Sequence, residues 1–305
     1  MRMSVIILGL VCLCALGVGV SASVQDEDVR GAFLTSRPKE KTANSSTGST
    51  TATVRPSRRK PKAPGSSNNP GKAPDKTPDK TPDKTKTPPS DPATPVNAPR
   101  LGLGVTLFMR DSNGLAVRVD PDHVFQKGDR VRVLLETNAD GYLYIFNTTN
   151  DGAATMIYPH ADLDDAGNYL QAHVPFEIPA SSATEERLRW FAFDETSGTE
   201  RLFFVFTREP LNGVPIDDDL IALCRDSKES CSTPKGEVWA GVQKQAQEPL
   251  KTDKSQQFGK AQTTGEQVAV ARGLGLAKED PPPSLVMMAS SRRPTLVATL
   301  DLIHK

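Results

Sequence analysis

The strongest constraint on the fold is a short strand that is apolar on both of its faces. The stretch YLYIFN (142–147) places three aromatic rings, Tyr142, Tyr144 and Phe146, on one face and aliphatic side chains on the other. In a two-layer sandwich, the outer face of a strand normally meets water. Such a strand therefore needs a cover from its own chain, or it leaves the aromatic rings open as an interaction face for a partner. We expect cover from the same chain.

Turn signals divide the centre of the chain into about seven segments with strand patterns. They are 104–110, 115–120, 130–138, 141–147, 153–159, 187–194 and 201–210. Asn113-Gly114 marks a hairpin between the first two segments. No helical crossovers separate the segments. The pattern predicts an all-β fold, an antiparallel β-sandwich of Ig-like or related topology over residues 99–226.

Beyond residue 226 the composition turns polar. We predict a polar tail over residues 227–305 that ends in one strand, PTLVATLDLIHK. Just before the tail, the run DDDLIALCRD predicts a short helix that starts near Asp217. This helix and the terminal strand are the candidates to cover the apolar outer faces.

The amino terminus has the layout of a secretory signal peptide. Arg2 precedes a long apolar run, and small residues lead up to Ala22. This order predicts a signal peptide over residues 1–22 with cleavage after Ala22. An uncleaved membrane anchor and lipidation at Cys12 or Cys14 are the alternatives.

Two segments of low apolar content connect the signal to the sandwich. Residues 23–38 hold too few apolar side chains for a domain, so we expect a flexible leader, with a docking peptide or an added strand as alternatives. Residues 39–98 repeat PDKT and predict a disordered Pro/Lys/Thr-rich linker. The linker would either hold the folded head away from its anchor point or simply connect two segments.

Cleavage of the signal would leave two cysteines, Cys224 and Cys231. An exported chain with one close cysteine pair favours a disulfide. A metal site would need more ligands than this stretch offers.

The central residues resemble a known bacterial family. The shared pattern consists of Gly128-Asp129, Gly141-Tyr142-Leu143-Tyr144, Asp151-Gly152, Tyr158-Pro159, Asn168, Ile178-Pro179, Gly198-Thr199-Glu200-Arg201-Leu202 and Glu209-Pro210. It resembles the family called domain of unknown function 4384, over roughly residues 124–211. The resemblance implies a bacterial, often exported protein whose domain accompanies catalytic or signalling modules in some members. It implies no catalytic residue.

One loop is a weak candidate for Ca²⁺. Its oxygen ligands are Asp162, Asp164, Asp165 and Asn168. The helical calcium-loop template fails because Ala166 and His173 occupy ligand positions. We therefore expect a solvated acidic loop, with no metal and no cofactor.

Common catalytic and nucleic-acid-binding patterns are absent from the sequence. The four histidines are not spaced as zinc ligands, and no serine lies in a G-x-S-x-G context. The 37 basic and 37 acidic residues balance, which argues against a nucleic-acid partner. We therefore expect no enzymatic activity.

These observations predict an exported, non-catalytic β-sandwich module that acts in protein interaction or envelope sensing. Its expected location is the periplasm or cell envelope of a bacterium, and its expected partner is an unknown envelope protein or surface. Membrane contact would require an uncleaved or lipidated amino terminus. Two alternatives are a hydrolase of envelope polymers, which a pocket of converging ionisable residues would favour, and a calcium-stabilised adhesive domain.

Overall fold

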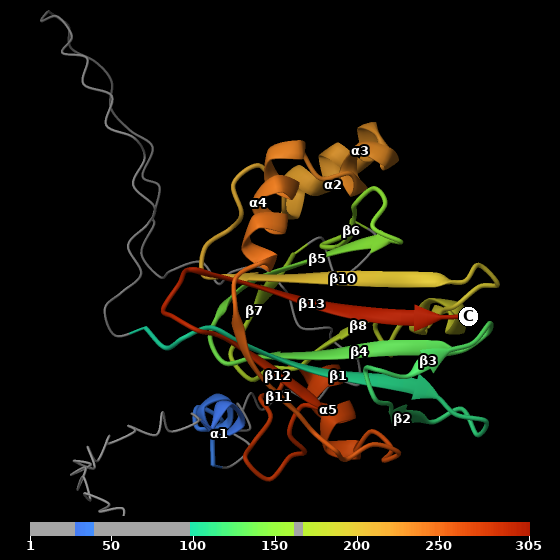
Figure 1. Cartoon of the computed structure of the whole chain (residues 1–305), viewed down its shortest axis with the longest axis vertical. Helices are drawn as coiled ribbons and strands as arrows, with labels where there is room; N and C mark the ends of the chain where they lie inside the picture. Colours follow the sequence, from blue (N-terminus) through green and yellow to red (C-terminus); the bar gives the residue numbers. More distant parts are fainter. Residues whose placement is uncertain (1–27, 40–97, 162–166) are drawn as a thin grey trace, which may run out of the picture.

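The computed structural model describes residues 28–39, 98–161 and 167–305 (Figure 1). The helices are α1 (Val29–Leu34), a 3-10 helix (Glu186–Arg189), α2 (Asp217–Asp226), α3 (Lys228–Ser232), α4 (Gly236–Ala246) and α5 (Thr264–Arg272). The strands are β1 (Gly102–Arg110), β2 (Ala116–Arg118), β3 (Val124–Phe125), β4 (Arg130–Thr137), β5 (Gly141–Thr149), β6 (Thr155–Tyr158), β7 (Tyr169–Leu170), β8 (Phe176–Ile178), β9 (Phe191–Ala192), β10 (Gly198–Thr207), β11 (Leu250–Lys254), β12 (Leu285–Ala289) and β13 (Thr295–His304). The predicted signal peptide and nearly all of the predicted linker lie outside the described residues.

The strands form two packed sheets, which confirms the predicted sandwich. Sheet A has the order β11-β12-β1-β4-β8, with β2 on β1 and β9 on β4. Sheet B has the order β3-β13-β10-β5-β6, with β7 on β5. Neighbouring strands are antiparallel except for the short parallel pair of β3 and β13. The predicted strand 187–194 begins within a 3-10 helix and contributes only the short β9.

Alternating residues of both sheets fill the space between them. Their buried side chains include Leu103, Val105, Leu107, Val133, Leu135, Leu143, Ile145, Leu202, Phe204, Phe206, Leu300 and Leu302. This period-two burial is what a strand with one face on a core requires. Apolar surface removed from water at this interface is the main stabilising contribution to the sandwich.

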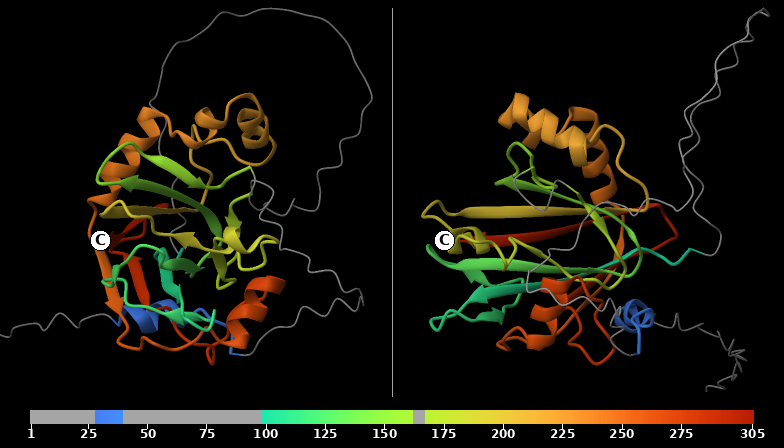
Figure 2. Two further views of the ribbon diagram at one scale, coloured as in Figure 1. Left: turned by 90° about the vertical axis from the view of Figure 1, so that its right-hand side faces the viewer. Right: turned by 180° about the vertical axis from the view of Figure 1, so that it is seen from behind.

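Helices cover the outer face of sheet B. Tyr142, Tyr144 and Phe146 are buried there together with side chains of α2, α3 and α4. The ring of Trp239 on α4 lies 6.0 Å from that of Phe146 and 4.9 Å from that of Phe203. The strand that is apolar on both faces is therefore covered by its own chain, as predicted, and its aromatic rings are closed to a partner in this structure. Figures 1 and 2 show these helices on one side of the stacked sheets, with α1 and α5 on the other.

The carboxyl-terminal third of the chain is part of the sandwich. β11 and β12 form one edge of sheet A, and β13 pairs with β10 along its whole length. The structure thus differs from the predicted boundary at residue 226, because residues 227–305 are no tail. The predicted helix near Asp217 does cover sheet B, whereas the terminal strand lies within that sheet. Long-range pairing of this kind leaves no local signal in the sequence.

The segment 28–39 packs against the outer face of sheet A. Phe33 of α1 is fully buried in a cluster with Val286 and Met288 of β12. The prediction of a flexible leader is therefore wrong for residues 28–38. The docking alternative is correct, in the form of a helix.

Two glycines of β1 make room for this docking. A Cβ built on Gly102 would lie 2.9 Å from a ring carbon of Phe33, and one on Gly104 would lie 2.4 Å from Cγ of Pro283. Glycine inside a strand often marks such a close approach. The two glycines therefore allow the covering segments to pack closely against β1.

We expect Gly104→Ala to destabilise the protein by about 1–3 kcal/mol, because the added methyl group overpacks this contact. Urea unfolding measures the effect. Gly241→Ala is the matched control: it lies in α4, and its Cβ would meet open space. That change should leave stability unchanged or raise it by about 0.5–1 kcal/mol. Equal stability of Gly104→Ala and the unchanged protein would contradict the close packing.

Candidate functional site

A cavity of about 280 Å³ opens at one end of the sandwich, beside the carboxyl end of β13 that Figure 1 marks C. We call it the end pocket. Its lining residues are Val131, Asn147, Ile157, Phe191, Ala192, Phe193, Asp194, Glu200, Leu202, Leu302 and His304. The volume lies at the small end of the range for small-molecule sites.

Strand register brings the polar side chains of the end pocket together. Leu202 of β10 lies opposite Asn147 of β5, Glu200 opposite Leu302 of β13, and Gly198 opposite His304. Alternate residues of a strand share one face, so Asn147, Glu200 and His304 all face sheet A. The side chain of Asn150 occupies the place of the missing Gly198 side chain, since a Cβ built on Gly198 would lie 2.8 Å from Asn150 Oδ1.

Glu200 is held by neighbours on one of its two oxygens. Its Oε2 accepts from Asn147 Nδ2 at 2.7 Å and from Thr149 Oγ1 at 2.9 Å. Its Oε1 lies 3.8 Å from His304 Nε2, which is too far for a direct hydrogen bond. The carboxylate is therefore fixed in place while Oε1 stays available.

Several buried polar atoms of the end pocket lack hydrogen-bond partners. His304 is only 4 % exposed, yet neither of its ring nitrogens has a partner, and Asn147 Oδ1 has none either. An unsatisfied buried polar group costs about 1–3 kcal/mol. These atoms have almost no exposed surface of their own, so the polar groups of the end pocket that a ligand can reach are the carboxylates of Glu200 and Asp194.

The remaining walls of the end pocket are apolar. The ring of Phe193 lies 5.0 Å from that of His304 and stacks at 4.7 Å on that of Phe125. Phe191 is 37 % exposed at the rim. The lining residues include the acids Glu200 and Asp194 and no lysine or arginine. The pocket thus combines an apolar body with an acidic polar corner.

A second cluster of ionisable groups lies on the outer face of sheet A. Arg118 is paired with Glu266, and Arg132 lies 3.9 Å from Glu177 and over the ring of Trp190. Burial lowers the pKa of both guanidinium groups, and the facing carboxylates partly offset it. Arg130 and Arg132 occupy alternate positions of β4, and two charged residues at such positions suggest a solvent-exposed strand face. The side chain of Arg132 is nevertheless buried. The adjoining cavity is only about 10 Å³, so this cluster is structural.

Two further grooves of about 340 Å³ each are lined by paired charges. In one, Arg201 binds Asp301 at 2.7 Å and Asp151 at 2.8 Å. In the other, Arg293 binds Glu248 at 2.8 Å. These grooves offer less free binding chemistry than the end pocket.

The weak calcium candidate falls largely outside the described residues, which do not include Asp162, Asp164 and Asp165. Asn168 is buried, and its Nδ2 donates to the carbonyl oxygen of Leu143 at 3.0 Å. It braces β5 beside β7. Within the described ranges, no three His, Cys, Asp or Glu side chains gather as metal ligands.

We expect removal of divalent metal to leave the melting temperature unchanged. A metal bound by the native state alone would stabilise it, so its removal would lower the melting temperature. Calorimetry with EDTA, and with excess Ca²⁺ as the reciprocal control, measures this. A drop with EDTA that Ca²⁺ restores would favour the adhesive-domain alternative.

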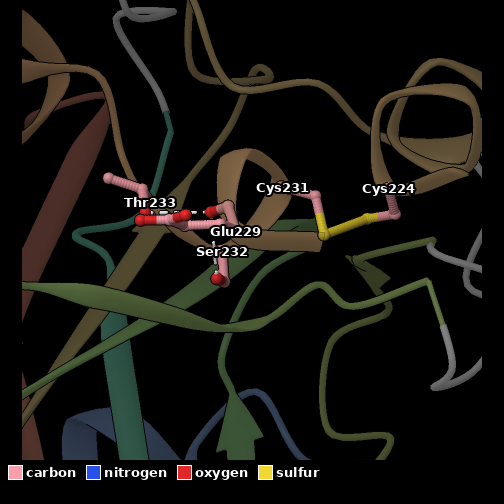
Figure 3. The surroundings of a disulfide bond; sticks show 5 residues. All are labelled: Cys224, Glu229, Cys231, Ser232 and Thr233. Atoms are coloured by element: carbon pink, nitrogen blue, oxygen red, sulfur yellow. Dashed lines mark hydrogen bonds between the residues drawn. A yellow bond between two sulfur atoms is a disulfide. The ribbon is translucent and has the colours of Figure 1, made fainter. Parts of the chain in front are cut away.

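The predicted disulfide is confirmed. Cys224 and Cys231 are bonded, with their Cα atoms 4.9 Å apart, and they join α2 to α3 (Figure 3). The carbonyl oxygen of Glu229 accepts from Ser232 Oγ at 3.2 Å and from Thr233 Oγ1 at 2.9 Å, which closes α3. The disulfide therefore stabilises the cover of sheet B.

We expect replacement of both cysteines by alanine to lower the free energy of unfolding by about 2–3 kcal/mol, because the unfolded chain regains the freedom of a short loop. Denaturant unfolding measures the loss. Reduction of the unchanged protein should reproduce it, and reduction of the variant should do nothing. A loss from reduction of the variant would point to another cause.

The fold and the pocket define a two-sheet β-sandwich with a ligand-sized cavity at one end. A model of the family named "Domain of unknown function (DUF4384)" matches residues 124–210. The match covers β3 to β10, which supply strands to both sheets and include Glu200 and Asn147. No curated protein matches the chain, and no solved structure does. Among the residues that the structure describes, no helix has the length and apolar character of a membrane span.

None of the four polar residues that line the end pocket, Asn147, Asp194, Glu200 and His304, was predicted from the sequence as a site residue. Glu200 stands inside the family pattern, but neither Asn147 nor His304 is marked by spacing. His304 and Asn147 are 157 positions apart by residue number, and only the pairing of β13 with β10 brings them to one cavity. One signal in the sequence was the alternation of inward and outward residues along a strand. By this alternation His304 shares the inward face of β13 with Leu300 and Leu302.

Proposed function

We propose that this chain is an exported, non-catalytic β-sandwich module that senses a small ligand in the bacterial envelope through its end pocket. The observation that carries the proposal is a cavity whose walls are mostly apolar and whose polar corner holds the available Oε1 of Glu200. Small-molecule sites typically combine apolar walls with a few polar groups that orient the ligand.

The amino-terminal signal pattern and the Cys224–Cys231 disulfide support the proposed compartment. Disulfides persist in oxidising compartments such as the periplasm. Residues 40–97 begin and end on the folded head, because residues 28–39 pack against sheet A, so the envelope partner, a protein or a surface, would meet the head itself. Ligand binding would then be read out by that partner.

A fragment screen by thermal shift tests the ligand pocket. Small apolar molecules with one polar group should raise the melting temperature of the unchanged protein. Ala192 lines the end pocket and is exposed, so Ala192→Phe should fill the cavity without disturbing the core. Fragments that stabilise both proteins equally bind elsewhere. Absence of any fragment selective for the unchanged protein would refute the proposal.

A hydrolase of envelope polymers is the second candidate. It is favoured by one observation, since the carboxyl groups of Glu200 and Asp194 line the same cavity and could act as acid and base. Mass analysis of envelope polymer fragments after incubation with the protein tests it. Turnover that Glu200→Gln abolishes would establish this candidate and displace the sensing module.

A further inference from the structure

We infer that the outer face of sheet A is a peptide-binding site for residues 28–38, and that two copies of the chain exchange this segment to form a reciprocal dimer. The site takes a short helix in which a buried phenylalanine lies between two arginines, in the pattern R-x-x-F-x-x-x-R. None of its residues lines the end pocket, so the inference goes beyond the proposed function and is independent of it.

The guanidinium group of Arg37 is bound as a ligand would be. Its Nε and Nη2 donate to the two oxygens of Glu136 at 2.7 and 2.5 Å. Three carbonyl oxygens accept from its terminal nitrogens at 3.2, 2.9 and 3.2 Å, those of Ala277, Asp280 and Pro281. These five hydrogen bonds match the five N–H donors of a guanidinium group. A lysine has three donors and no planar fork, so it cannot make the same contacts.

Two further anchors lie on one face of α1, which packs beside β11 and β12 (Figure 1). Arg30 donates to Asp253 Oδ1 at 2.6 and 2.9 Å and to the carbonyl oxygen of Pro283 at 2.6 Å. Phe33 is fully buried against β12, in close contact with Gly102 of β1. Buried aromatic and arginine side chains are the residues that most often carry the binding energy of an interface. The segment thus has the anchors of a bound peptide.

The length of the chain allows the segment to come from a second copy. Residues 40–97 join the segment to the rest of the chain, and a chain of that length can span at most about 190 Å. Exchange between two copies keeps every contact of the site, so docking is equally favourable from either copy. Such exchange of an identical element is a low-cost route to dimers. The dimer is therefore favoured as the local concentration of the protein rises.

Fluorescence anisotropy with a labelled peptide of residues 28–39 tests the site in the full chain. The variant Arg37→Ala weakens the binding of the chain's own segment and leaves Glu136 in place. We expect the peptide to bind this variant about tenfold more tightly, or better, than it binds the unchanged protein, whose site is filled. A peptide with Arg37→Lys should bind the variant about tenfold more weakly, because the planar fork is lost. The control peptide carries Lys39→Ala: it loses an exposed charge and should bind as the unchanged peptide does.

Two full-length variants test the exchange between copies. Glu136→Gln removes the carboxylate from the site of one copy, and Arg37→Ala removes the guanidinium from the segment of the other. When they are mixed, the intact segment of the first copy can dock in the intact site of the second. Light scattering should then show an assembly of about twice the mass of either variant alone.

Each result bears on a different step of the inference. Equal binding of the arginine and lysine peptides would overturn the guanidinium site. Tight binding of the peptide without a mixed assembly would overturn the exchange between copies. If near-UV circular dichroism shows that Arg37→Ala is unfolded, Arg37→Lys keeps the positive charge and replaces it, with the same expected results. Failure of the peptide to bind the folded variant would overturn the inference as a whole.

Discussion

A chain that ends at residue 226 will not fold into a stable sandwich. Such a chain keeps the whole of the family match but loses β11, β12 and β13. β10 then loses its partner along ten residues, and the core loses Leu296, Leu300 and Leu302. Burial of a leucine contributes about 1.5–3 kcal/mol, whereas the whole stability of a domain is about 5–15 kcal/mol. We expect no cooperative thermal transition.

The matched control is the chain 28–305, which keeps every described element. It should melt cooperatively, with native near-UV circular dichroism, while the chain 28–226 should show neither signal. A chain 28–226 that melts within a few degrees of the control would mean that the matched residues fold independently. The bare strand edges of β10 and β1 would also make the short chain prone to aggregation, which light scattering detects.

The features readable from the sequence are those encoded over a few neighbouring residues. The alternation of residues along the predicted strands, together with the turn signals, predicted the sandwich. The run of residues after Asp217 predicted α2. Thr263 and Glu266 form the capping box of α5, one residue before the equally spaced Thr264 and Gln267. Local chemistry thus locates an element to within about a residue.

The features that could not be read depend on partners far apart in the chain. α1 docks on strands more than 200 positions away, and β13 inserts beside β10 by backbone bonds that any sequence can make. Two signs were present all the same. Gly102 and Gly104 repeat at period two on one face of β1, which indicates a close approach. Arg132 and Glu136 stand four apart on one strand face, which indicates a buried charged layer once that face is covered.

The candidate site is the least predictable part. Its residues Asn147, Glu200 and His304 come from three strands, and each of these residue types also occurs elsewhere in the chain. What distinguishes them is their position at one cavity, a property of the folded molecule alone. A sequence pattern cannot express it, because Asn147 and His304 meet only through strand register.

We expect Arg37→Ala to lower the free energy of unfolding by about 3–5 kcal/mol, because it leaves a buried carboxylate without its cation. Arg37 Nε and Nη2 donate to the two oxygens of Glu136 at 2.7 and 2.5 Å. Both side chains are almost fully buried. His173 also contacts Glu136, with its Nδ1 2.6 Å from Glu136 Oε1. The Nε2 of the same ring lies 2.7 Å from Ser36 Oγ. Denaturant unfolding and hydrogen exchange over residues 28–39 measure the loss.

Arg30→Ala is the matched control within the same segment. Arg30 donates to Asp253 at 2.6 Å, but that pair is partly exposed, so its loss should cost much less. The double change Arg37→Met with Glu136→Gln should recover part of the loss, since no charge is then buried alone. Equal losses in Arg30→Ala and Arg37→Ala would show that burial of the charge is not the cause. The relative size of the two losses in the free energy of unfolding therefore tests what holds residues 28–39 on sheet A. A larger loss for Arg37→Ala indicates the buried ionic contact, and equal losses indicate the apolar helix alone.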